Sequence, residues 1–480
     1  MQKLVKNSVR KDVHTKVKAP IVEALKNAYE HPTYQFHIPG HTKGRAVLED
    51  FKQLTGTKVM ALDTTDEFDN LGTLHPATGP IKEALELAAE AFGAERTFFL
   101  LNGSTVGNIA MAIGCTKKGN KVLVNRNCHR SILTGMILSG AEPVWAIPKQ
   151  VEGWSIWGSI SPQDIEDALS KHDDISLVWI TNPTYEGVVS DIKSISAICK
   201  RYGVPLIVDE AHGCLWNFSD ALPTTALKLG ADAVLHSLHK TGGSMSQSSM
   251  LHIAKNSLID AEAVERALKL LHTTSPSMLL LASLDAARAS LTSFRGRKLL
   301  QRMVKNAKYL RRRIDNMENV YQLKPDFGFL TDVTKVFVRV DGLSGKRLET
   351  ILELDFNIEV ESASDIGVLL LVNQGNTFND VKYLADALEK VSQSNYTDLY
   401  YLENRKHMPL VIPQIKMTPR EAYFAGKETI SKYDAIGRIA AEVIAECPPG
   451  ISILLPGEII REEHLPYLKD YEFIEVVKES

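Results

Sequence analysis

Short apolar segments alternate with amphipathic segments through the first half of the chain. The apolar runs are typical of buried strands and lie at residues 97–101, 121–125, 176–181, 204–209 and 233–235. Helical spacing of apolar residues fills 80–92, 161–170 and 191–202. Strands that alternate with helices of this length predict an α/β fold with a mostly parallel sheet and helices on both faces.

The pattern changes on either side of this region. Residues 1–30 predict a basic lead-in and an amphipathic helix, in which Ile21, Leu25 and Tyr29 recur at helical spacing. Helical segments at 261–271 and 283–317 precede strand-like runs at 336–340, 358–361 and 367–372, and the polar, aromatic stretch 392–404 is typical of a connector. We therefore expect an N-terminal arm at 1–60, a large domain at 61–300, a smaller α/β domain at 301–390 and a C-terminal α+β domain at 391–480.

Charge and composition exclude several classes of protein. The chain has 480 residues, with 55 basic and 58 acidic side chains and a net charge of −3, which argues against a nucleic-acid-binding protein. We find neither a secretory signal nor an apolar run of membrane-spanning length, so we expect a cytoplasmic protein with no membrane partner. The five cysteines form no Cys-x-x-Cys pair, which favours reduced thiols and no metal site.

Polar clusters follow the predicted strands. Asp209-Glu-Ala-His212 follows one apolar run, Ser237-Leu-His-Lys240 follows the next, and His129 comes shortly after a third. In parallel sheets, ligands bind beyond the carboxyl ends of the strands, where these clusters would meet. Asn102-Gly-Ser-Thr breaks another run at the start of a helix, where backbone N–H groups and the helix dipole favour an anion.

This set of side chains is typical of a pyridoxal 5′-phosphate site. Lys240 can form a Schiff base with the aldehyde, and Asp209 can keep the pyridine nitrogen protonated. His212 can reach the phenolic oxygen, and His129 is placed to stack on the ring. The candidates for cofactor phosphate binding are Ser104, Thr105, Val106, Ser237 and His239. We predict catalytic roles for Lys240, Asp209, His129 and His212.

The motifs together resemble those of the bacterial ornithine/lysine/arginine decarboxylases. They are Phe36-His-Ile-Pro-Gly-His, Asn102-Gly-Ser-Thr, His129-Arg-Ser, Asp209-Glu-Ala-His-Gly, Ser237-Leu-His-Lys-Thr and Pro448-Pro-Gly-Ile, in order from about 30 to 460. The resemblance implies the aspartate-aminotransferase fold with a seven-stranded type of sheet, pyridoxal phosphate on Lys240, and a C-terminal decarboxylase domain. It also implies that Thr274 and Ser275 reach the phosphate of a neighbouring subunit, in a homodimer or tetramer. Because the first motif stands near the start of the chain, we expect the short form without an N-terminal wing domain.

The resemblance implies a basic amino acid as substrate. Arginine is the first choice, followed by lysine or ornithine, with agmatine, cadaverine or putrescine as the amine. A cationic side chain needs a carboxylate in its pocket, for which we prefer Glu458, with Asp63 and Asp66 as rivals; Thr184 is a further candidate for substrate binding.

Three other functions stay open at this point. An aminotransferase or aldolase would keep Lys240 and Asp209, and Arg339 is available as a clamp for a substrate carboxylate. A pyridoxal-phosphate-sensing regulator would need a DNA-binding domain ahead of the fold, for which residues 1–30 are too short. A cofactor-free structural protein would lack visible absorbance.

Overall fold

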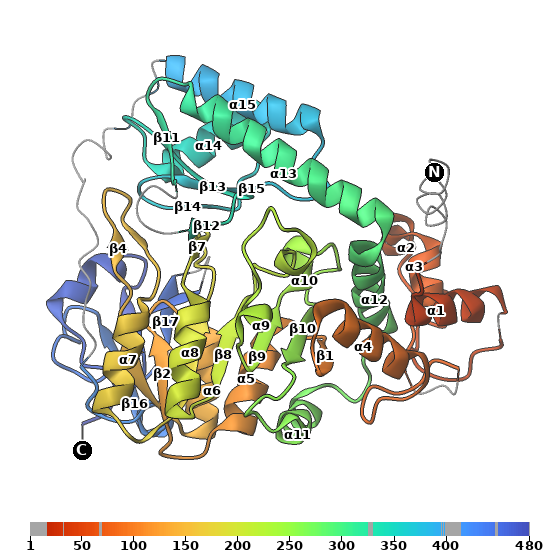
Figure 1. Ribbon diagram of the computed structural model, residues 1–480, viewed down its shortest axis with the longest axis horizontal. Coiled ribbons are helices and arrows are strands. Elements are labelled where there is room, and N and C mark those ends of the chain that lie inside the picture. The colour runs from red at the N-terminus through yellow and green to blue at the C-terminus, as the bar shows by residue number, and fades with distance from the viewer. Residues whose placement is uncertain are drawn as a thin grey trace, which may run out of the picture.

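A central sheet with two smaller units beside it organises the chain (Figure 1). The computed structural model describes residues 17–31, 33–66, 70–324, 330–394, 396, 398, 414–446 and 450–479. Within these ranges no helix combines the length and the apolar composition that a membrane span requires.

The central sheet has seven strands in the order β1-β10-β9-β8-β6-β2-β3. Their bounds are β1 Arg96–Leu100, β2 Lys121–Asn125, β3 Glu142–Ala146, β6 Ile175–Thr181, β8 Leu206–Asp209, β9 Ala233–His236 and β10 Ser249–Ile253. The five strands from β9 to β3 are parallel, whereas β10 is antiparallel to both β9 and β1. The prediction of a mostly parallel sheet is therefore confirmed. The apolar runs at β3 and β10 were not among the predicted strands.

Helices cover both faces of this sheet, as the alternating pattern predicts. On one face, α7 Pro162–Lys171, α8 Ile192–Tyr202 and α9 Ala226–Leu229 enclose an aliphatic core. On the other, α5 Gly103–Cys115, α6 Arg130–Ser139 and α11 Ala261–Leu271 pack around Trp179 and Leu235. The short helix α10 Leu238–Thr241 follows β9 on the side of the small unit (Figure 1). The short pairs β4 Gln150–Val151 with β5 Ile156–Trp157, and β7 Val188–Val189 with β12 Leu330–Thr331, lie outside the main sheet.

The small unit, residues 294–394, has an antiparallel sheet in the order β11-β13-β15-β14. Its elements are α13 Phe294–Asp315, β11 Val320–Gln322, β13 Lys335–Val340, α14 Gly345–Phe356, β14 Ser362–Ala363, β15 Val368–Leu371 and α15 Phe378–Gln393. The strand predicted at 358–361 is wrong, because 357–360 is irregular and the pairing begins at Ser362. The helix predicted at 283–317 is two helices, α12 Met278–Thr292 and α13, because Ser293 caps α13 through Gly296 N–H.

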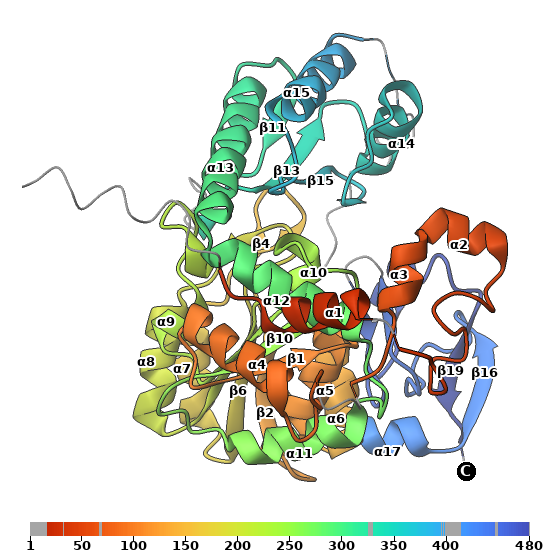
Figure 2. The same ribbon diagram turned by 90° about the vertical axis from the view of Figure 1, so that its right-hand side faces the viewer.

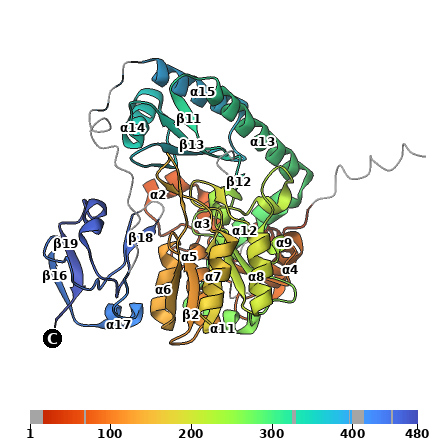
Figure 3. The same cartoon turned by 60° about the vertical axis from the view of Figure 1, so that its left-hand side comes forward.

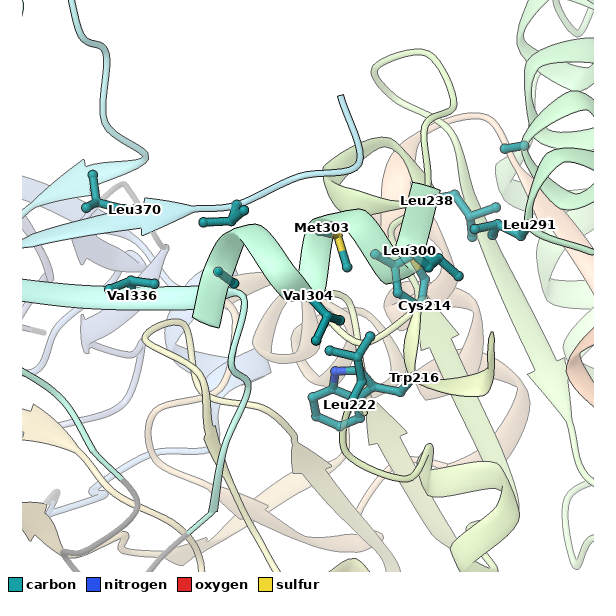
Figure 4. Close-up of a cluster of buried hydrophobic side chains, with 14 of the residues drawn as sticks. Cys214, Trp216, Leu222, Leu238, Leu291, Leu300, Met303, Val304, Val336 and Leu370 are labelled. Atoms are coloured by element: carbon teal, nitrogen blue, oxygen red, sulfur yellow. The ribbon is translucent and has the colours of Figure 1, made fainter. Parts of the chain in front are cut away.

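Helix α13 attaches the small unit to the central sheet. Figure 4 shows Leu300, Met303 and Val304 of this helix beside Trp216 and Leu222, which follow β8. Trp216 lies in the 3-10 turn Trp216–Phe218, and its indole N–H donates to Asp332 at 2.7 Å. This continuous apolar cluster holds the small unit over the carboxyl ends of the strands.

The C-terminal unit, residues 414–479, lies beside α5, α6 and β2 (Figure 3). It contains α17 Pro419–Phe424, β16 Lys427–Ser431, β17 Ile444–Glu446, β18 Ile451–Leu454, a 3-10 turn Glu462–Tyr467 and β19 Phe473–Val477. Arg420 donates to the carbonyls of Ile137 and Leu138 at the end of α6, which fixes this contact. Most of the predicted connector 392–404, and the prolines of Pro448-Pro-Gly-Ile, lie outside the described residues.

The first helix of the N-terminal region, α1, packs against α12 and α4 (Figure 2). The helices of this region are α1 Pro20–Glu30, α2 Glu49–Thr55 and α3 Thr57–Leu62, followed by α4 Gly79–Phe92. Ile21 and Leu25 are buried as predicted, but Tyr29 is 41% exposed and does not share their core. The predicted basic lead-in, residues 1–16, lies outside the described residues.

Candidate active site

A cavity of about 290 Å³ opens where β2, β6, β8 and β9 end. Eight of the predicted cofactor residues line it: Ser104, Thr105, His129, Asp209, His212, Ser237, His239 and Lys240. The adjacent parallel strands β8 and β9 bring the Asp209 and Lys240 segments together. The cavity therefore lies at the edge of the sheet where the sequence predicts a ligand.

A hydrogen-bonded chain forms the floor of this cavity; we call Asp209, Asn108, Ser131 and His129 the floor. Asp209 is buried, and its carboxylate accepts from Asn108 Nδ2 at 3.0 Å and from Ala211 N–H at 3.2 Å. Asn108 Nδ2 also donates to Ser131 Oγ at 2.9 Å, and Ser131 Oγ lies 2.7 Å from His129 Nδ1.

The hydrogen bonds of the floor fix the orientation of the His129 imidazole. Ser131 N–H donates to His129 Nδ1 at 3.2 Å, so Nδ1 is the acceptor and the ring proton is on Nε2. Burial lowers the pKa of His129, opposed by the Asp209 carboxylate and assisted by Lys240. A neutral imidazole in a fixed orientation is suited to stacking on a planar ring.

The amine of Lys240 faces an imidazole. Its Nζ lies 2.9 Å from His212 Nε2. Burial lowers the pKa of Lys240, while Asp209 and Glu361 oppose that shift. Burial and the positive charge of Lys240 hold the pKa of His212 well below its usual range, and His212 Nδ1 is buried without a partner among the described residues. A lysine with a lowered pKa is a better nucleophile near neutral pH.

Hydroxyl groups and a helix start gather at the other end of the cavity. Ser104, at the start of α5, and Ser237, after β9, place their hydroxyl oxygens 2.8 Å apart. His239 Nδ1 donates to the carbonyl of Ser248 at 2.8 Å, which leaves Nε2 for a ligand. Burial lowers the pKa of His239, whereas a bound phosphate would favour its doubly protonated form. These groups, with the α5 dipole, can hold a phosphate.

On the side that faces the small unit, the cavity is bordered by Tyr185 and by two residues of the small unit that bond to it, Lys335 and Glu361. We call these three residues the rim. Tyr185 lines the cavity, and its ring meets that of His212 edge to face at 5.3 Å. Its hydroxyl donates to Glu361 Oε1 at 2.8 Å. Lys335, only 2% exposed, donates to the Tyr185 carbonyl at 2.7 Å. Burial lowers the pKa of Lys335 to about 8.

Several predicted residues lie outside the lining of this cavity. Val106 points into the core behind α5, and Thr184 is buried, with Oγ1 accepting from Val188 N–H. Thr274 and Ser275 are exposed, so their predicted role toward a neighbouring subunit stays a prediction.

The three predicted carboxylates for the substrate side chain are each engaged within the chain. Glu458, 1% exposed, accepts from Arg126 at 3.1 Å and from Leu455 N–H at 3.0 Å. Asp63 Oδ2 lies 3.2 Å from His41 Nε2, and Asp66 Oδ2 accepts from Leu74 N–H at 2.8 Å. None of the three lines the cavity.

Arg339 does not reach the cavity. Its guanidinium lies 4.9 Å from the ring centres of both Trp154 and Tyr321, and NH1 donates to the Gly153 carbonyl at 2.7 Å. It is therefore engaged elsewhere and does not form the carboxylate clamp considered for an aminotransferase.

Sequence reasoning missed part of the site. The lining residues that it missed are Asn108, Asn127, Thr181, Pro183, Tyr185 and Gln247. The other lining residues, Asn102, Gly103, Ala211 and Ile451, belong to the predicted motifs. Tyr185 has a signal in the sequence, since it follows the end of β6 as Asp209 ends β8. Lys335 and Glu361 have none, because only the position of the small unit brings them near.

Comparison with known proteins agrees with this geometry. The family model described as "Orn/Lys/Arg decarboxylase, major domain" matches residues 19–339, and the model of the family's C-terminal domain matches residues 402–479. The chain belongs to the Orn/Lys/Arg decarboxylase family. As a member, it is an amino-acid decarboxylase, and the resemblance read from the sequence is confirmed.

Individual relatives cover nearly the whole chain. Proteins named arginine decarboxylase from Bacillus subtilis and Bacillus anthracis are 38% and 36% identical, in each case over 94% of this chain and 92% of the relative. Lysine decarboxylase LdcA of Pseudomonas aeruginosa is 27% identical over 95% of this chain and 75% of its own length. The solved structure of lysine decarboxylase A from Pseudomonas aeruginosa superposes with a TM-score of 0.85 at 24% identity, covering 96% of this chain and 81% of that one, which shows the shared fold.

The residues present fit pyridoxal phosphate, the cofactor of this family. The cavity combines a lysine amine of lowered pKa, a buried carboxylate, a stacking imidazole and an anion-binding helix start. The buried, unpartnered Nδ1 of His212 is consistent with a polar ligand beside it. Among the described residues, no three or more His, Cys, Asp or Glu side chains cluster in a way that could hold a metal ion.

Proposed function

We propose that the protein decarboxylates a basic amino acid with pyridoxal 5′-phosphate, and that arginine is the substrate, giving agmatine and carbon dioxide. Lysine and ornithine are the next candidates. The observation that carries the proposal is that Lys240 and Asp209 open into one cavity at the ends of adjacent strands. Arginine is preferred because the 36–38% identical relatives are named arginine decarboxylase.

The predicted residues that line the cavity each have a role in this proposal. Lys240 would hold the aldehyde carbon of the cofactor, Asp209 would keep the proton on its pyridine nitrogen, and His129 would stack on its ring. Ser104, Thr105, Ser237 and His239 would bind its phosphate. Val106, also predicted for the cofactor, does not line the cavity, and its backbone N–H donates to the Asn102 carbonyl at 3.4 Å. When bound, pyridoxal phosphate supplies the electron sink that accepts the pair left by the departing carboxylate.

The reaction consumes one proton, which must be delivered to Cα of the substrate. Lys240 Nζ and His212 Nε2 are 2.9 Å apart inside the cavity. The lowered pKa of Lys240 lets its amine release a proton more readily near neutral pH, and the neutral imidazole of His212 keeps that amine in place. We propose that this pair returns the proton.

The proposed active site also includes residues from a second copy of the chain. Thr274 and Ser275 are exposed in the single chain, as are Tyr34, Phe36 and Leu54 of the N-terminal region. Exposed aromatic and aliphatic side chains in one region favour a subunit interface. We propose a homodimer or tetramer in which Thr274 and Ser275 contact the cofactor phosphate of the neighbour.

The test is to incubate the protein with pyridoxal phosphate and arginine, lysine or ornithine, and to measure carbon dioxide, amine and keto acid. We expect agmatine and carbon dioxide in equal amounts from arginine. Lys240→Ala should lose at least about 10,000-fold in kcat and the visible absorption of the bound cofactor. Keto acid in place of carbon dioxide would instead indicate an aminotransferase.

A further inference from the structure

The C-terminal unit reaches the cavity at the turn between β2 and α6, residues 126–129. This turn carries Asn127 and His129, and both line the cavity. Beside it, Ile451 at the start of β18 lines the same cavity, although β18 belongs to the C-terminal unit. A residue from the C-terminal unit therefore completes a cavity that is otherwise built at the strand ends of the large sheet.

The backbone around His129 is bonded to the C-terminal unit. Arg130 N–H donates to the Gly450 carbonyl at 2.9 Å, and His129 pairs with Ile451 as an isolated antiparallel bridge. The bonds from Ser131 to the imidazole orient the ring of His129 but do not fix where the turn lies. The place of that ring in the cavity therefore also depends on how the turn is held against the C-terminal unit.

A buried ion pair holds the start of this turn. Arg126 NH2 donates to Glu458 Oε2 at 3.1 Å and to the Ile453 carbonyl at 3.0 Å. The guanidinium lies 4.7 Å from the ring centre of Trp145, and Leu455 N–H donates to the same carboxylate oxygen at 3.0 Å. Both charged side chains are buried. These directional bonds fix the distance between the turn and the segment from β18 to Glu458.

The ion pair is a costly way to attach one unit to another, because both charges lose their hydration. Arg126 NH1 and Glu458 Oε1 are buried and have no hydrogen-bond partner among the described residues, so the pair does not recover all of that cost. Apolar side chains of similar volume commonly give equal or greater stability. They do not give a fixed direction, because apolar contacts are non-directional and hydrogen-bonded ion pairs are directional.

We propose that Arg126 and Glu458 are positioning residues, whose ion pair holds the β2–α6 turn against the C-terminal unit and thereby sets the place of the His129 imidazole against the cofactor ring. The inference rests on the proposed function, in which His129 stacks on that ring. It gives Glu458 a role that acts through Arg126, and it gives the C-terminal unit a part in the geometry of the reaction.

The main test replaces both charges together, in Arg126→Met/Glu458→Leu. Apolar side chains refill the space, so the urea midpoint of unfolding should stay close to that of the wild type. We expect kcat per cofactor-loaded site to fall about 10- to 100-fold, with KM for arginine within about 3-fold. The visible circular dichroism of the bound cofactor should change, and amide hydrogen exchange in the cofactor-free protein should accelerate across residues 126–131.

The single variants separate positioning from stability. Glu458→Leu leaves a buried guanidinium that stays charged, so it should have the lowest urea midpoint. Arg126→Met should be milder, because burial raises the pKa of Glu458 and the remaining carboxyl can take up a proton. Glu458→Gln keeps an acceptor oxygen for Arg126 and should retain the dichroism and most of kcat despite lower stability. Recovery of kcat and dichroism in the double variant, together with stability, would overturn the proposal.

Arg420→Met is the matched control. Arg420 also attaches the C-terminal unit to the large sheet, but at the far end of α6, where it donates to the carbonyls of Ile137 and Leu138. Its loss should lower the urea midpoint and leave kcat, dichroism and exchange at 126–131 unchanged. Equal changes in Arg420→Met and in the double variant would show that general docking of the unit matters, and would overturn the proposal.

The same measurements distinguish this proposal from the proposed function. A wild type that binds pyridoxal phosphate and shows the predicted spectral differences, but releases no carbon dioxide from any of the three amino acids, would refute the reaction and support the positioning role. A wild type without visible absorption in the presence of pyridoxal phosphate would refute both. Normal carbon dioxide release with unaltered dichroism and kcat in the double variant would refute the positioning role alone.

Discussion

The floor and the rim of the cavity differ in how their polar groups are paired. In the floor, Asp209, Asn108 and Ser131 bond to one another in sequence and end at His129. All four come from the large sheet and the helices packed on it, and three of them are buried. In the rim, Lys335 and Glu361 come from the small unit and contact the cavity through a single residue, Tyr185.

This difference separates two tasks. A connected hydrogen-bond chain on rigid elements keeps groups in one geometry, which suits the chemistry at Cα. A charge carried on a separate unit can change without disturbing that geometry, which suits the choice of side chain. Substitutions in the floor should therefore lower kcat. Substitutions in the rim should change KM and the dependence of stability on pH.

The largest effect should follow Asp209→Asn. The amide has nearly the same shape but no charge to hold a proton on the cofactor's pyridine nitrogen, so we expect kcat to fall about 1,000-fold. Arginine binding should change far less. Carbon dioxide release over a range of arginine concentrations gives kcat and KM, which report the two quantities separately.

Asp209→Asn could also break the hydrogen bond that Asn108 Nδ2 donates to the carboxylate. The amide oxygen introduced at position 209 can still accept that bond if the new side chain turns correctly. A loss of binding as large as the loss of kcat would show that the variant disturbs the cavity as a whole, and would contradict the division between floor and rim.

The sequence pattern predicted the elements whose formation depends on residues close together in the chain. The strands that end at Thr181 and Asp209, and the helices between them, follow from apolar runs and helical spacing. The break between α12 and α13 was missed, because a serine inside a helical pattern is also compatible with one long helix. The strand β14 is only two residues long and carries no periodicity that sequence reasoning can use.

The site residues also fall into those that the sequence could identify and those that it could not. Asp209, Lys240, His129 and the hydroxyls of the phosphate end could be chosen because each follows a predicted strand. Glu458 was chosen as an acid after an apolar run and a turn, but the fold places Arg126 against it. Whether a carboxylate is free or neutralised depends on residues more than 300 positions away, and the sequence order does not reveal that pairing.

A smaller effect, confined to the rim, should appear in the pH dependence of stability. Burial lowers the pKa of Lys335 from 10.5 to about 8. Between these pH values the unfolded chain binds more protons at this lysine than the folded chain does, so its contribution to stability rises with pH. Relative to Lys335→Met, the wild type should gain up to about 3 kcal/mol in the free energy of unfolding from pH 8 to pH 10.5.

Urea denaturation of both proteins at a series of pH values measures this difference. Lys346→Met, an exposed change in the same small unit, serves as the control and should give a constant difference from the wild type. If the difference between wild type and Lys335→Met is also constant, Lys335 stays charged throughout the range and the rim is better solvated than its burial indicates.

The smallest effect should come from the middle of the floor. Ser131→Ala removes the hydroxyl between Asn108 Nδ2 and His129 Nδ1, while the Ser131 N–H that also donates to Nδ1 is retained. We expect kcat to fall about 10-fold, because the imidazole loses one of two constraints on its orientation.

The same variant has a second readout that a general loss of packing would not produce. Without one donor to its neutral form, the pKa of His129 should rise, so the acidic limb of the kcat profile should move to higher pH by less than about one unit. Thr134→Ala removes a hydroxyl of the same helix α6 that donates to the Arg130 carbonyl within that helix, and should leave the limb in place. A lower kcat with an unmoved limb would mean that Ser131 contributes to packing and that the floor does not extend from Asp209 to His129.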